Sequence, residues 1–360
     1  MDEGRAAWLR RAAIGVPAIL LLGWATTWAL APCRPLDRWL GRSDCVAHTR
    51  IDGVGALRQG LAPAPGRGLL VAGWAKSPDG HGEGSPTTLV WLNNDLDEIA
   101  RQPALPRGII EQIAVSSDGQ AIATTCNLLW TCDAGPTPLP RSADGGASQA
   151  PVVLMRFRTE SDPDPQTSIA RIDWVRTAPT DGADESMDGR TLTLAFTPDG
   201  RSLIAGDHGW ALDGHELATV PDDIGLPAAG FDAVGSRDGL LEARSEGLTG
   251  RILLRRAAGT VPLDPALPEG FIPELRRPLA LSPDGSLLAA LYRRFDLGTP
   301  RTVLRVWRVA EGSPLVATAL PDAYPALAWM PGDRIAVALP IGNIWDAETE
   351  IRLYAAGRAP

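Results

Sequence analysis

The fold of this chain is decided by the stretch LALSPDGSLLAAL, which occupies residues 279–291. Two short apolar runs flank a Ser-Pro-Asp-Gly turn, in which proline presets the first turn position and glycine supplies a positive φ. The stretch therefore predicts a strand, a tight turn and a second strand. Related stretches are IAVSSDGQAIA at 113–123 and LAFTPDGRSLIA at 194–205, so the unit is repeated.

The spacing of the turn aspartates gives the period of the repeat. Asp199 and Asp238 are 39 residues apart, Asp238 and Asp284 are 46 apart, and Asp284 and Asp333 are 49 apart. Four short strands in every 40–50 residues or so indicate a β-propeller. Asp118 and Asp199 are 81 residues apart, which is about two periods and leaves room for a degenerate copy.

We therefore predict an all-β protein with a single β-propeller of seven blades, in which residues 134–190 form a degenerate or loop-rich blade. Six blades is the alternative, if residues 136–190 are an insertion. Pro, Gly and Asp are frequent in this segment, while residues 152–155 and 169–175 still have the apolar character of strands.

The best-preserved unit indicates how one blade is built. It contains four expected strands, at residues 279–282, 287–292, 303–309 and 314–320. The last unit ends after its third strand, at Ala355. We predict that residues 46–51, which precede the first blade, supply its missing outer strand and close the ring.

At these turns and strands the chain resembles the WD-repeat family and the related SPDG propeller repeats, over about residues 50–356. It departs from the family pattern in two places: the Gly-His pair before the inner strand is missing, and Trp307 is followed by Arg308. The resemblance implies a binding or scaffolding module. It also implies that the working surface is a face of the disc, formed by the loops between strands and the mouth of the central channel.

An apolar segment near the N-terminus predicts a membrane anchor. Residues 12–31 carry no charge, and at about 1.5 Å per residue a helix of this length spans the roughly 30 Å core of a bilayer. Pro32 follows a small-residue motif and disfavours cleavage by signal peptidase. We expect a tail at 1–11, an uncleaved transmembrane signal-anchor helix at 12–31, a linker at 32–45 and the propeller at 46–356.

The cysteines bear on the side of the membrane on which the propeller lies. They form two close pairs in the sequence, Cys33 with Cys45 and Cys126 with Cys132, and local even pairing favours disulfides and an oxidising compartment. Four buried thiols are the alternative. Because three arginines flank each side of the span, charge does not orient it. We expect a single-pass protein of a bacterial inner membrane, with the propeller periplasmic.

Composition narrows the classes of function. The net charge is −9, and no basic cluster follows Arg42, so nucleic acid is not an expected partner. The sequence lacks the Gly-x-Ser-x-Gly elbow, the phosphate-binding loop and the dinucleotide fingerprint. We therefore expect no cofactor and no resident metal.

One predicted hairpin carries the weak candidates for an enzyme or metal site, Asp207, His208, His215 and Glu216, although their spacing matches no known metal motif. Seven tryptophans recur at about one per blade, which favours packing between blades over a ligand platform. They are Trp74, Trp91, Trp130, Trp174, Trp210, Trp307 and Trp329.

The function expected from these observations is a membrane-anchored propeller that binds or scaffolds a protein partner and is not an enzyme. Two alternatives remain open. One is a propeller-type hydrolase or lyase with its site at the central channel. The other is an envelope-assembly or sensor subunit whose partner is another membrane protein.

Overall fold

The computed structural model describes Cys33 and most of the chain from Cys45 onward. The described residues are Cys33, 45–55, 60–74, 86–105, 110–126, 149–157, 170–179, 194–197, 199–206, 208–218, 233–235, 241–245, 251–273, 279–294, 301–321, 325–341 and 348–356. Their regular structure is entirely β.

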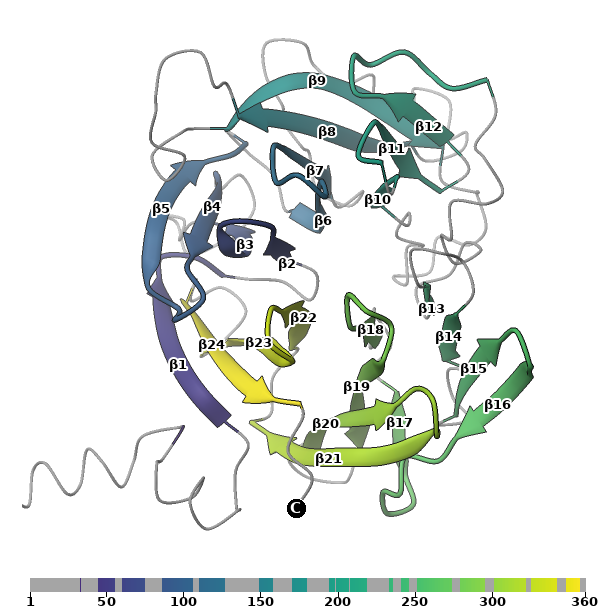
Figure 1. The fold of residues 1–360 in the computed structure, drawn as a ribbon. Helices are drawn as coiled ribbons and strands as arrows, with labels where there is room; N and C mark the ends of the chain where they lie inside the picture. The colour runs from purple at the N-terminus through teal and green to yellow at the C-terminus, as the bar shows by residue number, and fades with distance from the viewer. Residues whose placement is uncertain are drawn as a thin grey trace, which may run out of the picture.

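These residues form six antiparallel sheets, arranged as the blades of a propeller around a central axis (Figure 1). Blade I contains β2 (Leu61–Ala64), β3 (Gly68–Trp74), β4 (Thr87–Leu92) and β5 (Glu98–Pro103). Blade II contains β6 (Ile110–Val115), β7 (Ala121–Cys126), β8 (Gln149–Phe157) and β9 (Ala170–Pro179). Blade III contains β10 (Leu194–Phe196), β11 (Ser202–Ala205) and β12 (His208–Ala211).

The second half of the ring follows the same order from the axis outward. Blade IV contains β13 (Ala233–Gly235), β14 (Glu242–Ser245), β15 (Ile252–Arg256) and β16 (Gly259–Leu263). Blade V contains β18 (Leu279–Leu281), β19 (Leu287–Arg294), β20 (Arg301–Arg308) and β21 (Ser313–Leu320), and β17 (Phe271–Pro273) also pairs with β19. Blade VI contains β22 (Ala326–Met330), β23 (Arg334–Pro340), β24 (Glu348–Ala355) and β1 (Cys45–Asp52).

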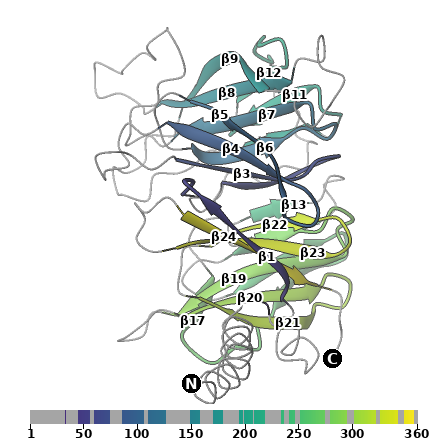
Figure 2. The same ribbon diagram turned by 90° about the vertical axis from the view of Figure 1, so that its left-hand side faces the viewer.

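Blade VI confirms the predicted closure of the ring. Strand β1 pairs antiparallel with β24, with Cys45 opposite Tyr354 and Asp52 opposite Glu348. The outer strand of the last blade therefore comes from the start of the propeller sequence, as Figure 2 shows at the rim where β1 lies outside β24. This pairing leaves no open edge at the junction between the first and last blades.

The prediction of seven blades is wrong, because the 81 residues between Asp118 and Asp199 contain one blade and not two. The expected strands at 152–155 and 169–175 do form, as parts of β8 and β9. However, β8 pairs with β7, so both strands complete the sheet that begins with β6. Long connections within one blade lengthened its spacing to about two periods.

The hydrophobic core lies between neighbouring blades. Ile51, Ile351 and Leu353 of blade VI share one buried cluster with Leu69 and Val90 of blade I. Similar clusters join blade I to II, II to III, IV to V, and V to VI. Blades I, II, V and VI therefore bury both of their faces, and their central strands are apolar on both sides, as the pattern BBBBBBBi of β19 illustrates.

Several sequence-based expectations lie outside the described residues. These are the tail at 1–11, the span at 12–31, and the linker at 32–45 apart from Cys33 and Cys45. In the part of the chain that is described, no helix has the length and apolarity needed to cross a membrane.

The closing strand gives the first testable prediction. Ile51 is 2% exposed and packs between blades VI and I, so Ile51→Ala should destabilise the ring by about 2–5 kcal/mol. The midpoint of denaturant unfolding measures the effect. His48→Ala, an exposed position on the same strand, should change stability by less than about 0.5 kcal/mol. Equal effects of the two changes would contradict the role of β1.

Candidate functional site

The repeated turns are built by one hydrogen-bond network, present in blades II, III and V. In blade V the Ser282 hydroxyl donates to Asp284 Oδ1 over 2.6 Å and accepts a hydrogen bond from the backbone N–H of Leu287 over 2.9 Å. Asp284 Oδ1 also accepts from the backbone N–H of Ser286. The carboxylate and the hydroxyl together satisfy backbone donors that the tight turn leaves unpaired.

The same network recurs with equivalent residues in the other two blades. The hydroxyls of Ser116 and Thr197 each donate over 2.6 Å to the aspartate two positions later, Asp118 and Asp199. Each hydroxyl also accepts from the backbone N–H five positions later in the chain. The structural unit of the repeat is thus a Ser or Thr two positions before an Asp-Gly pair. Proline at the position between them is not part of the network, so Ser117 can replace it in blade II.

These hydrogen bonds stabilise the charged form of the aspartates. The bond from the Ser282 hydroxyl, followed by that from the Ser286 N–H, lowers the pKa of Asp284 to about 2. The pKa of Asp199 is lowered for the same reason. At Asp118 burial acts in the opposite direction, but the bonds from Ser116 and Gln120 outweigh it and the pKa is lowered there too. The turns therefore present fixed negative charges at neutral pH.

The turns of successive blades touch one another around the channel. A Cβ atom added to Gly119 would lie 2.5 Å from the Pro65 carbonyl oxygen of blade I, and one added to Gly200 would lie 3.1 Å from Ser117 Oγ of blade II. Glycine is required at these positions both for the positive φ, 70° and 69°, and for the close approach of the next blade. The inner turns thus form a continuous surface, which we call the turn face.

The described turn face carries both signs of charge, with four aspartates and the three arginines Arg67, Arg201 and Arg334. Asp118, Asp199, Asp284 and Asp333 are exposed, and the ion pairs among the described residues include none of the four. Arg334, the arginine beside Asp333, instead donates to the carbonyl oxygens of Pro331 and of Asn94 in blade I. Asp118, Asp284 and Asp333 are consequently available to a partner, whereas the positive charge of Arg201 acts on Asp199.

The central channel has a different character. The inner strands β2, β6, β10, β13, β18 and β22 consist almost entirely of apolar residues, and Glu111 is their single ionisable residue. Gln112 on β6 uses its side-chain oxygen to accept the backbone N–H of Leu194 in blade III. These inner strands therefore bring no set of acids and bases together at the axis.

The sequence-predicted candidates of blade III do not form one cluster. His208 Nδ1 lies 3.2 Å from Glu216 Oε1, whereas His215 Nδ1 lies 3.1 Å from Asp213 Oδ1, so each histidine has its own carboxylate. Asp207 lies outside the described residues. His208 also stacks on Trp210, with ring centroids 6.2 Å apart. Within the described ranges, no three His, Cys, Asp or Glu side chains are placed to hold a metal ion.

The cysteines predicted to pair are described in part. Cys33 and Cys45 form a disulfide with a Cα–Cα distance of 5.1 Å. Cys126 ends β7, and Cys132 lies outside the described residues, so the second disulfide stays a prediction.

Tryptophans connect the blades, as the repeat predicted, and several do so through a hydrogen bond. The indole N–H groups of Trp174, Trp307 and Trp329 donate to the carbonyl oxygens of Leu212, Asp264 and Ala280, each in a neighbouring blade or its connection. All three rings are at most 8% exposed. They therefore serve packing rather than a ligand platform, and the sequence of blade IV contains no tryptophan.

A buried polar pair at the interface of blades IV and V gave no signal in the sequence. Tyr292 on β19 is fully buried and Arg305 on β20 is 8% exposed. Burial raises the pKa of the Tyr292 hydroxyl, and burial lowers the pKa of Arg305 although the negative charge of Asp264 opposes this. An arginine within an otherwise apolar strand is expected to face solvent. Only the packing of the adjacent blade shows that Arg305 is buried.

Comparisons with known proteins find only distant similarity. No protein-family model matches the chain, and no curated protein matches it. TolB from Acinetobacter baumannii is similar over 80% of this chain, with 14% identity and a TM-score of 0.44, and this chain spans only 64% of TolB. The β-propeller domain of Myceliophteria thermophila Cps50 (Swd1) is similar over 84% of this chain and 98% of its own, with 11% identity and a TM-score of 0.43.

A structural-genomics protein of unknown function from Bacteroides thetaiotaomicron is also similar. It matches 85% of this chain and 75% of its own, with 10% identity and a TM-score of 0.45. One fold supports many activities, so these neighbours leave the function open.

The turn network predicts an acid-sensitive contribution to stability. Because the folded pKa of Asp284 is depressed to about 2, its contribution is complete above the unfolded value of about 4 and is lost as pH falls towards 2. Ser282→Ala should cost about 1–3 kcal/mol at pH 7, because it leaves the Leu287 N–H without its acceptor, and should reduce the further loss between pH 4 and 2. Unfolding midpoints across this pH range measure both effects.

Ser117→Ala is the matched control for this network, since Ser117 is an exposed turn serine outside it. It should retain the stability of the original chain at pH 7 and its full loss of stability in acid. An unchanged acid profile in Ser282→Ala would contradict the role assigned to the hydroxyl.

The separation of the two histidines predicts indifference to metal ions. Because His208 and His215 face different carboxylates, zinc or a chelator should leave the thermal midpoint unchanged. His215→Ala should change stability by less than about 0.5 kcal/mol, since its side chain is largely exposed. A zinc-dependent rise in the midpoint that His215→Ala abolishes would contradict this separation.

Proposed function

We propose that this protein is a membrane-anchored β-propeller that binds a protein partner through its turn face and has no catalytic site of its own. The anchor is the uncharged segment at 12–31, and the propeller lies on the periplasmic side of a bacterial inner membrane. The WD-repeat resemblance points to the same use of a disc face. The proposal rests mainly on the exposed carboxylates of Asp118, Asp284 and Asp333 on the rigid turn face, none of which forms an ion pair among the described residues.

Rigidity favours binding through this face. The hydroxyl–aspartate networks of blades II, III and V fix three turns in one conformation, so little conformational entropy is lost when a partner docks. Successive turns also support one another through contacts such as that of Gly119 with Pro65. A broad face of this kind suits a protein surface or an extended segment that offers arginine or lysine side chains.

The composition of the inner strands argues against the alternative of a channel enzyme. General acid–base chemistry needs titratable groups within hydrogen-bond reach of each other and of a substrate. The inner strands contain one ionisable residue, Glu111, and the two candidate histidines of blade III are held apart. The binding module therefore remains the preferred function.

Affinity isolation from solubilised membranes tests the proposal. The full chain should resist extraction by alkaline carbonate and should copurify with a protein partner in a fixed ratio. Asp95 lies in the turn between β4 and β5, which Arg334 joins to the turn face through Asn94. Asp95→Asn combined with Asp333→Asn removes two exposed charges from this area. Both positions tolerate asparagine, including Asp333 with its φ of 53°. Since exposed charge pairs contribute about 0.2–1 kcal/mol each, loss of two such pairs should weaken partner binding about two- to thirtyfold.

Arg301→Gln is the control at the opposite end of blade V. Arg301 is exposed at the start of β20 and pairs with the last residue of β19, far along the strand from the turn at Asp284. This change should leave partner recovery unchanged. Equal loss in both variants, or no copurifying partner, would overturn the proposed binding face.

A further inference from the structure

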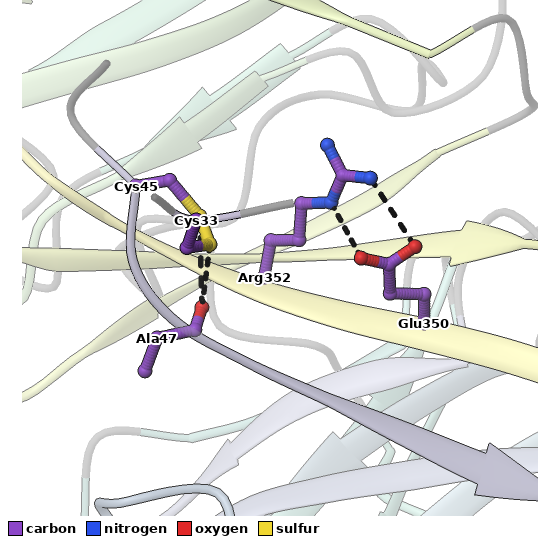
Figure 3. A network of polar contacts seen from close by, with 5 residues as sticks. All are labelled: Cys33, Cys45, Ala47, Glu350 and Arg352. Carbon is purple, nitrogen blue, oxygen red and sulfur yellow. Dashed lines mark hydrogen bonds and ion pairs between the residues drawn. A yellow bond between two sulfur atoms is a disulfide. The ribbon is translucent and has the colours of Figure 1, made fainter. Parts of the chain in front are cut away.

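The disulfide lies where the chain enters the ring. Cys45 is the first residue of β1 and is buried in the cluster between blades V and VI, and Cys33 packs against the same cluster. Figure 3 shows the disulfide beside the ion pair of Arg352 and Glu350 on β24. The cross-link therefore fixes Cys33 to the body of the propeller, at the outer strand of blade VI. We call β1 and Cys33 together the closing edge.

This position changes the effective length of the connection to the proposed anchor. From residue 31 to Cys45 the chain is 14 residues long, which could reach about 48 Å when extended. With the disulfide formed, the path from residue 31 to Cys33 is only two residue steps, which could reach about 7 Å. The Cα–Cα distance of 5.1 Å from Cys33 to Cys45 adds little. Oxidation thus shortens the connection about fourfold.

The size of the propeller decides what this shortening does. A compact body of about 310 residues has a radius of gyration of about 20 Å and hence a diameter near 50 Å. A connection of about 48 Å would let such a body turn either face or any edge towards the membrane. A connection of about 12 Å is shorter than the radius, so the closing edge must stay at the lipid surface.

The distribution of charge agrees with this orientation. Residues 32–50, on the same side of the proposed span as the propeller, contain four basic and two acidic residues, and residues 51–360 contain 27 basic and 39 acidic residues. The net charge is therefore +2 over residues 32–50 and −12 over residues 51–360. On β1 itself the exposed side chains are His48, Arg50 and Asp52, so the charges of Arg50 and Asp52 balance and the positive charge lies in the residues before β1. Anionic headgroups would attract the basic residues that lead into the closing edge and repel the acidic remainder of the propeller.

We propose that the closing edge is a membrane-facing surface, which the Cys33–Cys45 disulfide holds against anionic lipid headgroups. The proposal rests on the proposed membrane anchor at residues 12–31. It adds to that function a defined orientation: blade VI lies at the lipid and blade III, across the ring (Figure 1), lies farthest from it. Reduction of the disulfide lengthens the connection between the anchor and the propeller. The propeller can then move farther from the lipid surface while the anchor stays in the membrane.

Photolabelling from lipid tests the orientation. The full chain is reconstituted into vesicles of phosphatidylglycerol and phosphatidylcholine that contain a lipid with a photoreactive headgroup, and labelled peptides are mapped by mass spectrometry. In the oxidised chain, peptides that cover residues 45–52 should carry most of the label, and peptides that cover residues 208–218 of blade III should carry almost none. The variant carrying both Cys33→Ser and Cys45→Ser should lose this contrast, as should the original chain after reduction.

Two controls separate the disulfide from other effects. The variant carrying both Cys126→Ser and Cys132→Ser should label like the original chain and respond to reductant in the same way. Thermal unfolding should confirm that the variant lacking Cys33 and Cys45 still folds, and reduction of the original chain in place gives a second measurement that needs no substitution.

The outcomes distinguish this inference from the function on which it rests. Label spread equally over 45–52 and 208–218 in an oxidised chain that resists carbonate extraction would overturn the orientation alone. The same contrast in the presence and absence of the disulfide would overturn the role of the cross-link. A chain released by carbonate before labelling would overturn the anchor and the orientation together.

Discussion

Closure of the ring through β1 and β24 is the constraint on which the rest of this structure depends. A single blade cannot bury either of its faces, since the hydrophobic clusters lie between neighbouring sheets. Each cluster needs both partners, and the one between blades VI and I is completed by Ile51, which comes from the beginning of the propeller sequence. The segment that closes the ring is also the segment nearest the proposed anchor. The strand that stabilises the ring therefore lies at the same edge as the connection to the proposed membrane anchor.

The inner turns serve a second purpose besides reversing the chain. A serine or threonine hydroxyl, an aspartate and a glycine form the same network in blades II, III and V, and they leave the carboxylate charged and exposed. Backbone donors would otherwise go unsatisfied in these tight turns. The stabilising interaction consequently places a negative charge on one face of the disc. A surface built in this way carries charge as a consequence of folding, and a binding partner can use it without further ordering of the chain.

Much of the fold could be predicted from local patterns. The strands of blade V and the closure by residues 46–51 followed from the repeated turn and from the strand missing after Ala355. The packing role of the tryptophans followed from their recurrence, and Trp307 and Trp329 do lie between blades. The number of blades could not be obtained in this way. A spacing of 81 residues is compatible with two short units or one long one, and only the pairing of β8 with β7 decides between them.

The candidate residues illustrate the same division. The Ser-x-Asp-Gly and Thr-x-Asp-Gly spacing could have indicated the turn network, because all of its partners lie within five residues of one another. The separate carboxylate partners of His208 and His215, and the burial of Arg305, depend on contacts that spacing leaves open.

The sequence by itself determined the strand–turn–strand unit, its repetition, the strand missing from the last unit and the extra strand before the first. These features depend on periodicity and turn chemistry over short distances. The tertiary structure alone decided which strands share a sheet, which polar groups are buried between blades and where Cys33 meets the ring. The physical reason is that burial and pairing are properties of two surfaces in contact, and a single segment specifies only one of them.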